Sequence, residues 1–398
     1  MKPRILINMH YMEIGGAERA LLGLLNAIDT DKVDVDLFIN QHTGEFMKLI
    51  PEKINLLPEI SAYSVIEKPI STAIKKGHLG IAFARLLAKL HHKYFSEKAV
   101  NGIDDYSIFH YIAKYTTPLL PSLRKYGEYN LAISFLMPHN IVKDKVCARK
   151  KIAWIHTDYA TININTSAEL QIWNKFDNII SISTDVTKSY MTVFPLLKNR
   201  IIEIENILSP TLIRQQATLF TPVEMHDNVL KICSIGRFCY QKNFENIPYI
   251  AQLLKEKGLN FRWYIVGFGD TSETIENIKK TNTADCVILL GKKENPYPYI
   301  SYCNIYVQPS RYEGKSVTVR EAQILGRPVI ITNYPTAKSQ VQNGIDGIIC
   351  DMDNLSIADA IYNLATNKNK QSEISEYLLS HDYGNMSDIE KIYNLTNV

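Results

Sequence analysis

Arg311-Tyr-Glu-Gly-Lys-Ser-Val-Thr-Val-Arg-Glu321 is the stretch that decides the fold, because an apolar run leads into it and a helical pattern leaves it. Residues 305–310 form a short apolar run that contains a proline near its end, which predicts a buried strand. Residues 316–325 carry apolar side chains at helical spacing. Glu313 is therefore predicted in a strand-to-helix loop, and Glu321 about a turn and a half inside the helix, so that both carboxylates point into one cleft.

The segment between the two glutamates predicts a site for an anion. Gly314, Lys315, Ser316 and Val317 would present backbone N–H groups at the positive end of the helix, where a phosphate binds well. A sugar nucleotide would suit both features, with its phosphates on the amides and its hydroxyls on the carboxylates. An exposed helix can also carry two glutamates at this spacing by chance, so other residues must agree.

The Glu-x7-Glu pattern of Glu313 and Glu321 resembles the donor-holding motif of the retaining glycosyltransferases of family 4 (glycosyl transferases group 1). The resemblance covers most of the chain. It implies the α/β architecture called GT-B, in which two Rossmann-like, doubly wound lobes face an interlobe cleft. By resemblance, Glu313 contacts the transferred sugar as a catalytic residue, and Glu321 holds the ribose.

The stretch Cys233-Ser-Ile-Gly-Arg-Phe-Cys-Tyr-Gln-Lys-Asn-Phe244 is similar to the Gly-Arg…Lys segment of this family. The matching residues, Arg237 and Lys242, would bind the donor diphosphate. Two fixed cations would stabilise the negative charge that develops on the leaving group as the glycosidic bond breaks. The alternative is an ordinary solvated arginine and lysine beside a turn.

A pair of glycines, Gly15 and Gly16, follows the strand-like residues 4–10 and precedes an apolar helical stripe. Glycines at such a turn let the backbone approach a ligand closely. The pair does not fit the Gly-x-Gly-x-x-Gly pattern of dinucleotide-binding enzymes, since the third glycine is missing. It resembles instead the first-lobe Gly-Gly loop of the family, which faces the donor; the alternative is a glycine turn that packs on a strand.

His156 follows another buried-looking strand, residues 151–156, at a place where open α/β sheets bind their ligands. It resembles the first-lobe histidine near the donor sugar in this family, with a role in catalysis that Asp158 could assist. The alternative is a structural hydrogen bond at a strand end. By the same resemblance, Gly267 borders the donor pocket and Lys293 contacts the nucleobase.

Length and pattern predict two lobes, since 398 residues exceed one ordinary core and apolar runs alternate with helical stripes throughout. The predicted division is an acceptor-binding lobe over 1–206, a nucleotide-sugar-binding lobe over 207–375, and a C-terminal helix over 376–398 that returns to the first lobe. The predicted strands cover residues 4–10, 33–40, 131–135, 151–156 and 178–183 in the first lobe, and 230–237, 261–267, 287–291, 305–310, 328–332 and 347–350 in the second.

The first lobe is basic, because residues 1–150 carry 20 Lys and Arg against 15 Asp and Glu, whereas the whole chain has a formal net charge of +3. Part of the excess lies in residues 66–100, where leucines and a phenylalanine recur at helical spacing beside lysines. A basic amphipathic helix of this kind could bind an anionic membrane surface. An ordinary helix with an apolar core face and a solvated lysine face would have the same sequence pattern.

No stretch is long and apolar enough for a transmembrane helix or a signal peptide, so a cytoplasmic location is expected, with peripheral attachment to the inner face of the plasma membrane as an open alternative. The six cysteines include no Cys-x2-Cys pair, and no His cluster has metal-ligand spacing, so reduced thiols are expected. No cofactor is expected beyond the nucleotide sugar, the reaction is expected to be metal-independent, and no nucleic acid partner is expected.

Together these features imply a transferase that moves a sugar from a nucleotide diphosphate sugar, with UDP favoured, to a hydroxyl group with retention of configuration. The acceptor would be a glycan or lipid-linked oligosaccharide in the assembly of capsule, exopolysaccharide, lipopolysaccharide or teichoic acid. One rival is a GT-B-like subunit that binds sugar nucleotide or glycan without transfer. The more distant rival is a nicotinamide-dependent oxidoreductase, against which the missing glycine fingerprint counts.

Overall fold

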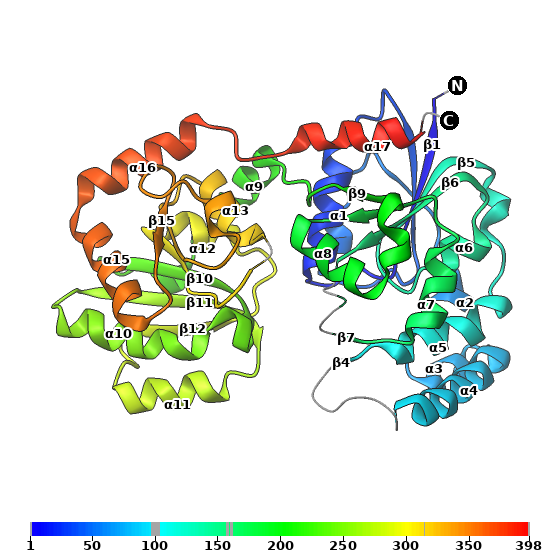
Figure 1. Ribbon diagram of the computed structural model, residues 1–398, viewed down its shortest axis with the longest axis horizontal. Helices are drawn as coiled ribbons and strands as arrows, with labels where there is room; N and C mark the ends of the chain where they lie inside the picture. The colour runs from blue at the N-terminus through cyan, green and yellow to red at the C-terminus, as the bar shows by residue number, and fades with distance from the viewer. Residues whose placement is uncertain (1, 97–103, 157–158, 160–161, 314, 397–398) are drawn as a thin grey trace. The chain divides into compact units, whose positions relative to one another are not determined.

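The computed structural model describes residues 2–96, 104–156, 159, 162–313 and 315–396. The chain forms two compact units (Figure 1). The first comprises Met1–Ile207 and Met386–Val398, and the second comprises Leu208–Asn385. The units thus divide one residue after the predicted boundary.

The first unit contains a seven-stranded parallel sheet. Its spatial order is β3 (Asn55–Leu56), β2 (Asp34–Ile39), β1 (Arg4–Met9), β5 (Tyr129–Ser134), β6 (Ala148–Ile155), β8 (Asn178–Ser181) and β9 (Ile201–Glu203). The five predicted strands are present, and the two edge strands, β3 and β9, were not predicted. A separate two-stranded ladder pairs β4 (Asp104–Asp105) with β7 (Ile162–Asn163).

Helices cover both faces of this sheet because successive strand residues point to opposite sides, with Ile5 and Ile7 in one apolar core and Leu6 in the other. The α-helices are α1 (Gly16–Ala27), α2 (Ser61–Ser64), α3 (Ile70–Lys75), α4 (Leu79–Ser96), α5 (Ser107–Thr116), α6 (Asn140–Lys145), α7 (Thr166–Trp173), α8 (Thr184–Val193) and α17 (Ile389–Thr396). Short 3-10 helices are η1 (Glu45–Leu49), η2 (Thr117–Leu119), η3 (Leu123–Tyr126), η4 (Pro195–Arg200) and η8 (Met386–Asp388). Within the described ranges, no helix combines the length and hydropathy needed to cross a lipid bilayer.

The second unit contains a six-stranded parallel sheet. Its order is β12 (Val287–Gly291), β11 (Phe261–Gly269), β10 (Leu230–Phe238), β13 (Ile305–Gln308), β14 (Val329–Thr332) and β15 (Ile348–Cys350). All six strands were predicted, to within two residues at each end. Its helices are α9 (Pro210–Ala217), α10 (Ile247–Glu256), α11 (Ser272–Thr281), α12 (Tyr297–Tyr302), α13 (Val317–Ile324), α14 (Ala337–Gln340), α15 (Asn354–Thr366), α16 (Lys368–Ser380), η5 (Val223–Met225), η6 (Tyr240–Lys242) and η7 (Phe244–Asn246).

Each sheet is doubly wound, so each contains one place where the order of strands along the chain reverses. In the first sheet the reversal lies between β1 and β5, and in the second it lies between β10 and β13. At such a point, the loops after the two neighbouring strands run in opposite directions and form a crevice between them. Open α/β sheets bind their ligands in this crevice. The residues that follow these four strands are therefore the first to consider as a functional site.

The chain rejoins the first unit at Met386. This is later than the predicted position 376, because α16 continues to Ser380 and buries Ile374 and Leu378 in the core of the second unit. Helix α17 packs apolar side chains into the first unit's core, and the Tyr393 hydroxyl accepts a hydrogen bond of 2.7 Å from the Asp29 backbone N–H. Residues of α17 are therefore a structural part of the first unit.

Candidate functional site

A lysine and a glutamate meet at the strand reversal of the second sheet. Lys242 lies in η6 after β10, and Glu313 lies in the loop after β13. The Lys242 Nζ is 2.6 Å from Glu313 Oε1, and the two side chains are only 16% and 6% exposed. Because ion pairs gain strength where water is excluded, this pair is electrostatically stronger than a surface pair, at the cost of desolvating both charges. The sequence predicted both residues, and the structure brings them together.

A chain of buried hydrogen bonds from β13 holds the Glu313 carboxylate in place. The Tyr306 hydroxyl donates to Gln308 Oε1 (2.8 Å), the Gln308 amide donates to Ser310 Oγ (2.8 Å), and Ser310 Oγ donates to Glu313 Oε1 (2.6 Å). Tyr306 and Gln308 are two positions apart in β13, and Ser310 follows two positions later. Every second residue of a strand points to the same side, so the three side chains lie on one face of the sheet. Such a fully satisfied polar chain holds the carboxylate in one orientation.

The second oxygen of Glu313 has spare capacity to accept a hydrogen bond. Glu313 Oε2 accepts from the Gln241 amide at 3.2 Å, and the Glu313 carbonyl accepts from the Thr336 hydroxyl at 2.8 Å. A carboxylate has about four lone-pair sites, and the contacts from Lys242, Ser310 and Gln241 use three. The arrangement can therefore accept one more O–H group at an otherwise fixed position.

Two glycines let the strands below this pair lie close together. Gly236 in β10 and Gly267 in β11 are direct neighbours in the sheet. A Cβ atom on Gly236 would lie 3.3 Å from the aliphatic stem of Lys242, and a Cβ on Gly267 would lie 2.0 Å from the Gly236 carbonyl oxygen. Gly267, predicted at the border of the donor pocket, thus keeps the backbone compact beneath Lys242.

Arg237 projects from β10 as an exposed cation beside a second one. Its guanidinium lies 5.5 Å from the centre of the Phe268 ring, and Lys292 Nζ lies 5.6 Å from the same ring. Arg237 and Phe268 are register partners in β10 and β11. The Phe268 ring therefore holds two cations near the strand ends by cation–π attraction.

The predicted anion seat at the start of α13 is described in part. Gly314 lies outside the described residues, and Lys315 is half-buried before the helix that begins at Val317. The Ser316 backbone N–H donates to Gln340 Oε1 at 3.2 Å, because the Gln340 amide packs against this turn. That N–H is therefore already used within the protein.

Glu321, inside α13, is fully buried, and its Oε1 accepts a hydrogen bond of 2.8 Å from the Tyr297 hydroxyl of α12. Lys293 lies apart from this contact, with its Nζ 2.9 Å from Glu224 Oε1 and 5.2 Å from the Tyr299 ring centre. Partial burial lowers the pKa of Lys293, but the contacts with Glu224 and Tyr299 outweigh it and raise the pKa above its ordinary value. Lys293 is therefore a cation with a partner inside its own unit.

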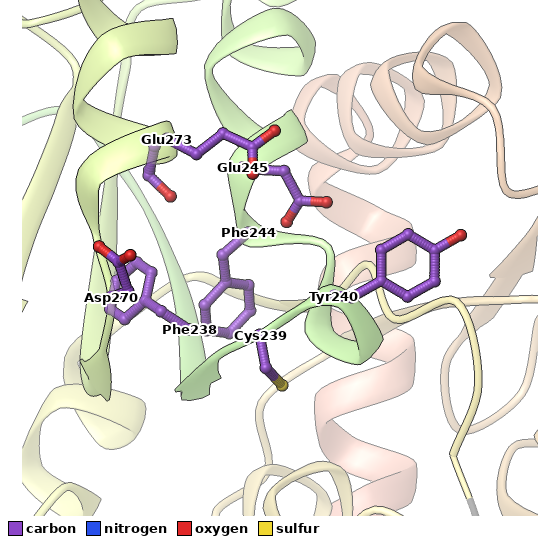
Figure 2. A pocket seen from close by; sticks show the side chains of 8 residues that line it. Phe238, Cys239, Tyr240, Phe244, Glu245, Asp270 and Glu273 are labelled. Carbon is purple, nitrogen blue, oxygen red and sulfur yellow. The ribbon is translucent and has the colours of Figure 1, made fainter. Parts of the chain in front are cut away.

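A cavity of about 220 Å³ lies next to the end of β10 (Figure 2). Figure 2 shows that Glu245, Asp270 and Glu273 surround it together with Tyr240. Arg311 binds Glu245 at 2.5 Å and lies over the Tyr240 ring. Arg311 offsets the charge of Glu245, but Asp270 and Glu273 still repel an anion, so this cavity does not suit a diphosphate.

In the first unit, the predicted glycine pair lies at the N-terminus of α1. A Cβ on Gly15 would overlap the Glu18 carboxylate, at 2.1 Å from Oε2, whereas a Cβ on Gly16 would meet nothing within 4 Å. Gly16 thus has open space in front of it. Gly15 is restricted by the side chain one turn further along α1, not by a neighbouring strand.

Three histidines gather at the ends of the central strands of the first sheet. His10 follows β1, His139 lies five residues after β5, and His156 follows β6, all three strands being neighbours. His10 Nδ1 is 2.6 Å from Glu67 Oε1, and His139 Nδ1 is 2.8 Å from Ser134 Oγ. His156 lies against the Phe135 and Trp154 rings, while Asp158, its predicted assistant, lies outside the described residues.

Burial separates the charge states of these histidines. It lowers the pKa of His139 and of His156 to about 3, so both rings are neutral at neutral pH. Burial also lowers the pKa of His10, but the Glu67 carboxylate more than offsets it and raises the pKa above 6.5. The strand ends therefore offer two neutral imidazoles, which can accept or donate a hydrogen bond, beside one imidazole paired with a carboxylate.

Sequence reasoning missed several of these residues. His10 was read only as the last residue of a predicted strand, although it shares with His156 the position directly after an apolar run. Ser310 likewise ends the run before Glu313. A polar side chain at the carboxyl end of a predicted parallel strand was the signal available for both.

Within the described ranges, no group of three or more His, Cys, Asp or Glu side chains is arranged to hold a metal ion. Three Asp-x-Asp pairs occur, at 29–31, 34–36 and 351–353. In the first pair, Asp29 Oδ1 accepts a hydrogen bond of 2.9 Å from the Asp31 backbone N–H. Asp36 accepts hydrogen bonds from Arg4, Tyr129 and Asn55, and Asp353 caps α15 through the Ser356 backbone N–H. Each pair thus has a hydrogen-bond partner within the protein.

Comparison with known families gives one domain. Residues 217–379 match the family described as Glycosyl transferases group 1. This segment includes Lys242, Glu313 and Glu321. The chain is 27% identical over 235 residues to an uncharacterized glycosyltransferase of Haemophilus influenzae, covering 57% of each chain. It is 27% identical over 154 residues to CapM, a capsular polysaccharide biosynthesis glycosyltransferase of Staphylococcus aureus, covering 38% of this chain and 40% of CapM. The chain thus spans about half the length of the curated relatives it matches, or less.

Solved structures resemble the whole chain. TarM of S. aureus, solved in complex with fondaparinux, α-GlcNAc-glycerol and UDP, has a TM-score of 0.67 at 15% identity, with both chains fully covered. HepE of Anabaena, solved in complex with UDP, has a TM-score of 0.62 at 14% identity, with 98% of each chain covered. At these identities the likeness establishes the fold alone. The chain therefore has the GT-B fold, and its residues 217–379 match the family described as Glycosyl transferases group 1.

Proposed function

We propose that this protein is a retaining hexosyltransferase, which moves a sugar from a nucleotide diphosphate sugar to a hydroxyl group of a glycan or lipid-linked oligosaccharide during cell-surface polysaccharide synthesis. The observation that carries the proposal is the largely buried Lys242–Glu313 pair at the strand reversal of the matched domain. Relatives named for capsular polysaccharide and amylovoran biosynthesis support the pathway class.

Lys242 and Arg237 would stabilise the diphosphate leaving group. Lys242 has three N–H donors, of which Glu313 uses one, so others remain for phosphate oxygens. Arg237 is exposed and oriented by the Phe268 ring. Charge that develops on a leaving phosphate is stabilised most by cations that are already in place.

Glu313 would hold the transferred sugar. Its remaining lone pair on Oε2 can accept a sugar hydroxyl, and the chain of hydrogen bonds from Tyr306 keeps that lone pair fixed. Glu321 is assigned the ribose hydroxyls and Lys293 the nucleobase, both by family resemblance. A phosphate that used the Ser316 N–H would have to replace the Gln340 side chain as its partner.

The first unit would contribute hydrogen-bonding groups that carry no net charge. Neutral His156 can accept or donate to a sugar hydroxyl, and the open side of Gly16 lets a ligand approach the backbone. Retention follows from the family 4 resemblance, with the leaving phosphate helping to deprotonate the acceptor. On this scheme the protein positions and stabilises charge, and the reaction needs no metal ion.

UDP is the favoured nucleotide, because TarM and HepE were solved with UDP and the second unit shares their fold. We also propose a cytoplasmic location with peripheral attachment to the inner membrane face, where lipid-linked acceptors are found.

The first experiment is saturation-transfer NMR of the purified protein with UDP, GDP, dTDP and CMP sugars, and with NAD as a control, followed by a transfer assay. Selective binding of one diphosphate sugar that is lost in Arg237→Ala supports the donor assignment. Transfer that persists in EDTA supports metal independence. Binding without transfer to any acceptor glycan would indicate a binding subunit, and binding of NAD alone would overturn the proposal.

A further inference from the structure

Helix α4 presents an unusual row of large apolar side chains to solvent. Leu79, Phe83, Leu86, Leu90 and Tyr94 are 49–67% exposed. They recur at spacings of three and four residues, so they form one stripe along the helix, which we call the α4 apolar face. Leu119 of η2, which is 51% exposed, lies beside it, next to Gly80. Exposed apolar surface of this extent marks an interaction site.

The opposite side of α4 already has its packing partner. Ile81, Ala84 and Ala88 are buried, and His91 contacts the Tyr111 and Tyr115 side chains of α5. Figure 1 shows α4 at the periphery of the first unit beside α3 and α5. The apolar face is therefore not the core face of an amphipathic helix, as one reading of the sequence had it, but a second apolar surface on the same helix.

The charged residues of α4 and of the segment just before it are all cationic. Residues 68–96 contain six Lys and Arg and no Asp or Glu. Arg85 points inward and donates to the Val65 and Lys68 carbonyls. The exposed lysines are Lys75, Lys76, Lys89 and Lys93. Lys89 and Lys93 flank the stripe along one side, because they precede Leu90 and Tyr94 by one position on the helix.

We propose that the α4 apolar face docks onto an anionic lipid bilayer, with the helix parallel to the membrane plane. Its apolar side chains would enter the acyl boundary while the lysines contact lipid phosphates. The helix of 18 residues is about 27 Å long, so the stripe can lie flat along its whole length. A second copy of the chain is disfavoured, because two such faces would bring lysines against lysines.

This proposal rests on the peripheral attachment proposed above, to which it assigns a surface and a lipid class, and it is independent of the Lys242–Glu313 site. A docked α4 would hold the first unit, to which the acceptor-binding role is assigned, at the surface where lipid-linked acceptors lie. Membrane binding and transfer to a soluble acceptor are separate measurements, so failure of either proposal is recognised without the other.

The test is flotation of the full-length protein with vesicles of phosphatidylcholine containing about 30% phosphatidylglycerol, and with pure phosphatidylcholine. We expect binding to the anionic vesicles alone, weakened by salt. The double variant Leu86→Asp/Leu90→Asp should lose binding by about tenfold or more. The matched control is Leu196→Asp, which changes an 83% exposed leucine of η4 in the same unit and should bind normally. Lys89→Glu/Lys93→Glu should lose the preference for anionic lipid.

Binding of the double variant at the level of the Leu196→Asp control would overturn the proposal, as would equal binding to neutral vesicles. Sedimentation velocity without lipid tests whether a second copy of the chain binds the α4 apolar face. A dimer that forms at high protein concentration and disappears in Leu86→Asp/Leu90→Asp would assign the face to a second copy of the chain instead.

Discussion

The two sheets have the same topology at their strand reversals but different chemistry. In the second unit, a buried cation and carboxylate, Lys242 and Glu313, form a close pair held by neutral hydrogen bonds from Ser310 and Gln241. In the first unit, His10 and His139 follow the two strands at the reversal, and His156 follows the next strand. Burial leaves His139 and His156 neutral, whereas His10 contacts the Glu67 carboxylate. One fold thus offers a charged site and a mainly neutral one.

The difference is informative because each kind of site suits another part of a sugar nucleotide. Fixed charges gain most where charge develops during reaction, as on a leaving phosphate. Neutral donors and acceptors suit hydroxyl groups, which remain uncharged. The comparison therefore predicts that substitutions in the second unit affect catalysis strongly, whereas those in the first affect pH dependence and ligand fit.

The largest expected effect is that of Lys242→Ala. Removal of this cation should lower kcat/KM by about 10²- to 10³-fold, equivalent to about 3–4 kcal/mol of transition-state stabilisation. The measurement is steady-state transfer with the donor identified by NMR. Near-normal turnover of Lys242→Ala would show that this cation does not take part in the reaction.

The matched control for this variant is Lys255→Ala. Lys255 pairs with Asp285 at 2.8 Å, but on the surface, where its side chain is 36% exposed. Surface pairs contribute about 0–1 kcal/mol, so stability and turnover should stay close to the parent protein. A comparable loss of activity in Lys255→Ala would mean that lysine loss acts through general destabilisation.

The glycines give the next largest expected effect. Gly267→Ala places a Cβ against the Gly236 carbonyl oxygen, so two strands must move, at a cost of about 3 kcal/mol in unfolding free energy. Gly16→Ala meets no atom and gains helix propensity, so its stability should change by less than about 0.5 kcal/mol. Urea unfolding compares the two variants. If Gly16→Ala keeps its stability yet loses transfer, a ligand approaches the first unit there.

The neutral site should make the first unit sensitive to acid. The pKa of His139 falls from 6.5 to about 3 on folding, so below pH 6.5 the unfolded chain binds more protons than the folded protein. The free energy of unfolding therefore decreases as the pH is lowered below 6.5. Between pH 6.5 and 5 this single group costs about 2 kcal/mol. His156 acts in the same direction, whereas His10, whose pKa is raised, stabilises below pH 6.5 and loses that effect as pH rises.

His139→Gln isolates this contribution. The loss of stability between pH 7 and 5, followed by fluorescence of the adjacent Trp173, should be smaller in the variant than in the parent. An unchanged pH dependence would show that the His139 ring is already charged or exposed in the folded protein.

A smaller effect than that of His139 is expected for the hydrogen bond to Glu321. Tyr297→Phe removes the hydroxyl that donates to Glu321 Oε1 and should cost about 1 kcal/mol in unfolding free energy. If Glu321 holds the ribose, the KM for the donor should rise while kcat changes little. A fall in kcat with unchanged KM would assign Glu321 to the reacting centre instead.

Central strands could be predicted from the sequence because both faces of a parallel sheet are buried, which leaves continuous apolar runs such as residues 305–310. The missed strands, β3 and β9, have only two and three residues at sheet edges, too short for any periodic signal.

The site could be predicted only in part, since it depends on which loops become neighbours. The resemblance assigned both Lys242 and Glu313 to the donor site, but nothing in their spacing requires a contact across 71 positions. His10 and His139 come together only because β1 and β5 are adjacent in the sheet. The α4 apolar face was ambiguous for the same reason, because periodicity identifies a stripe but not what covers it.

Helix α17 has a consequence for how this protein is made. Ile389, Ile392 and Leu395 complete the core of the first unit, although a ribosome synthesises them after all of the second. During synthesis, the core formed by residues 1–207 therefore stays incompletely packed until α17 has been made, after the second unit. Residues 208–385 have no such dependence, and their two ends are joined by a hydrogen bond of 2.9 Å from the Leu208 N–H to Asn385 Oδ1. We therefore expect the second unit to fold as one continuous fragment, whereas the first should need its C-terminal segment added back, in cis or as a peptide.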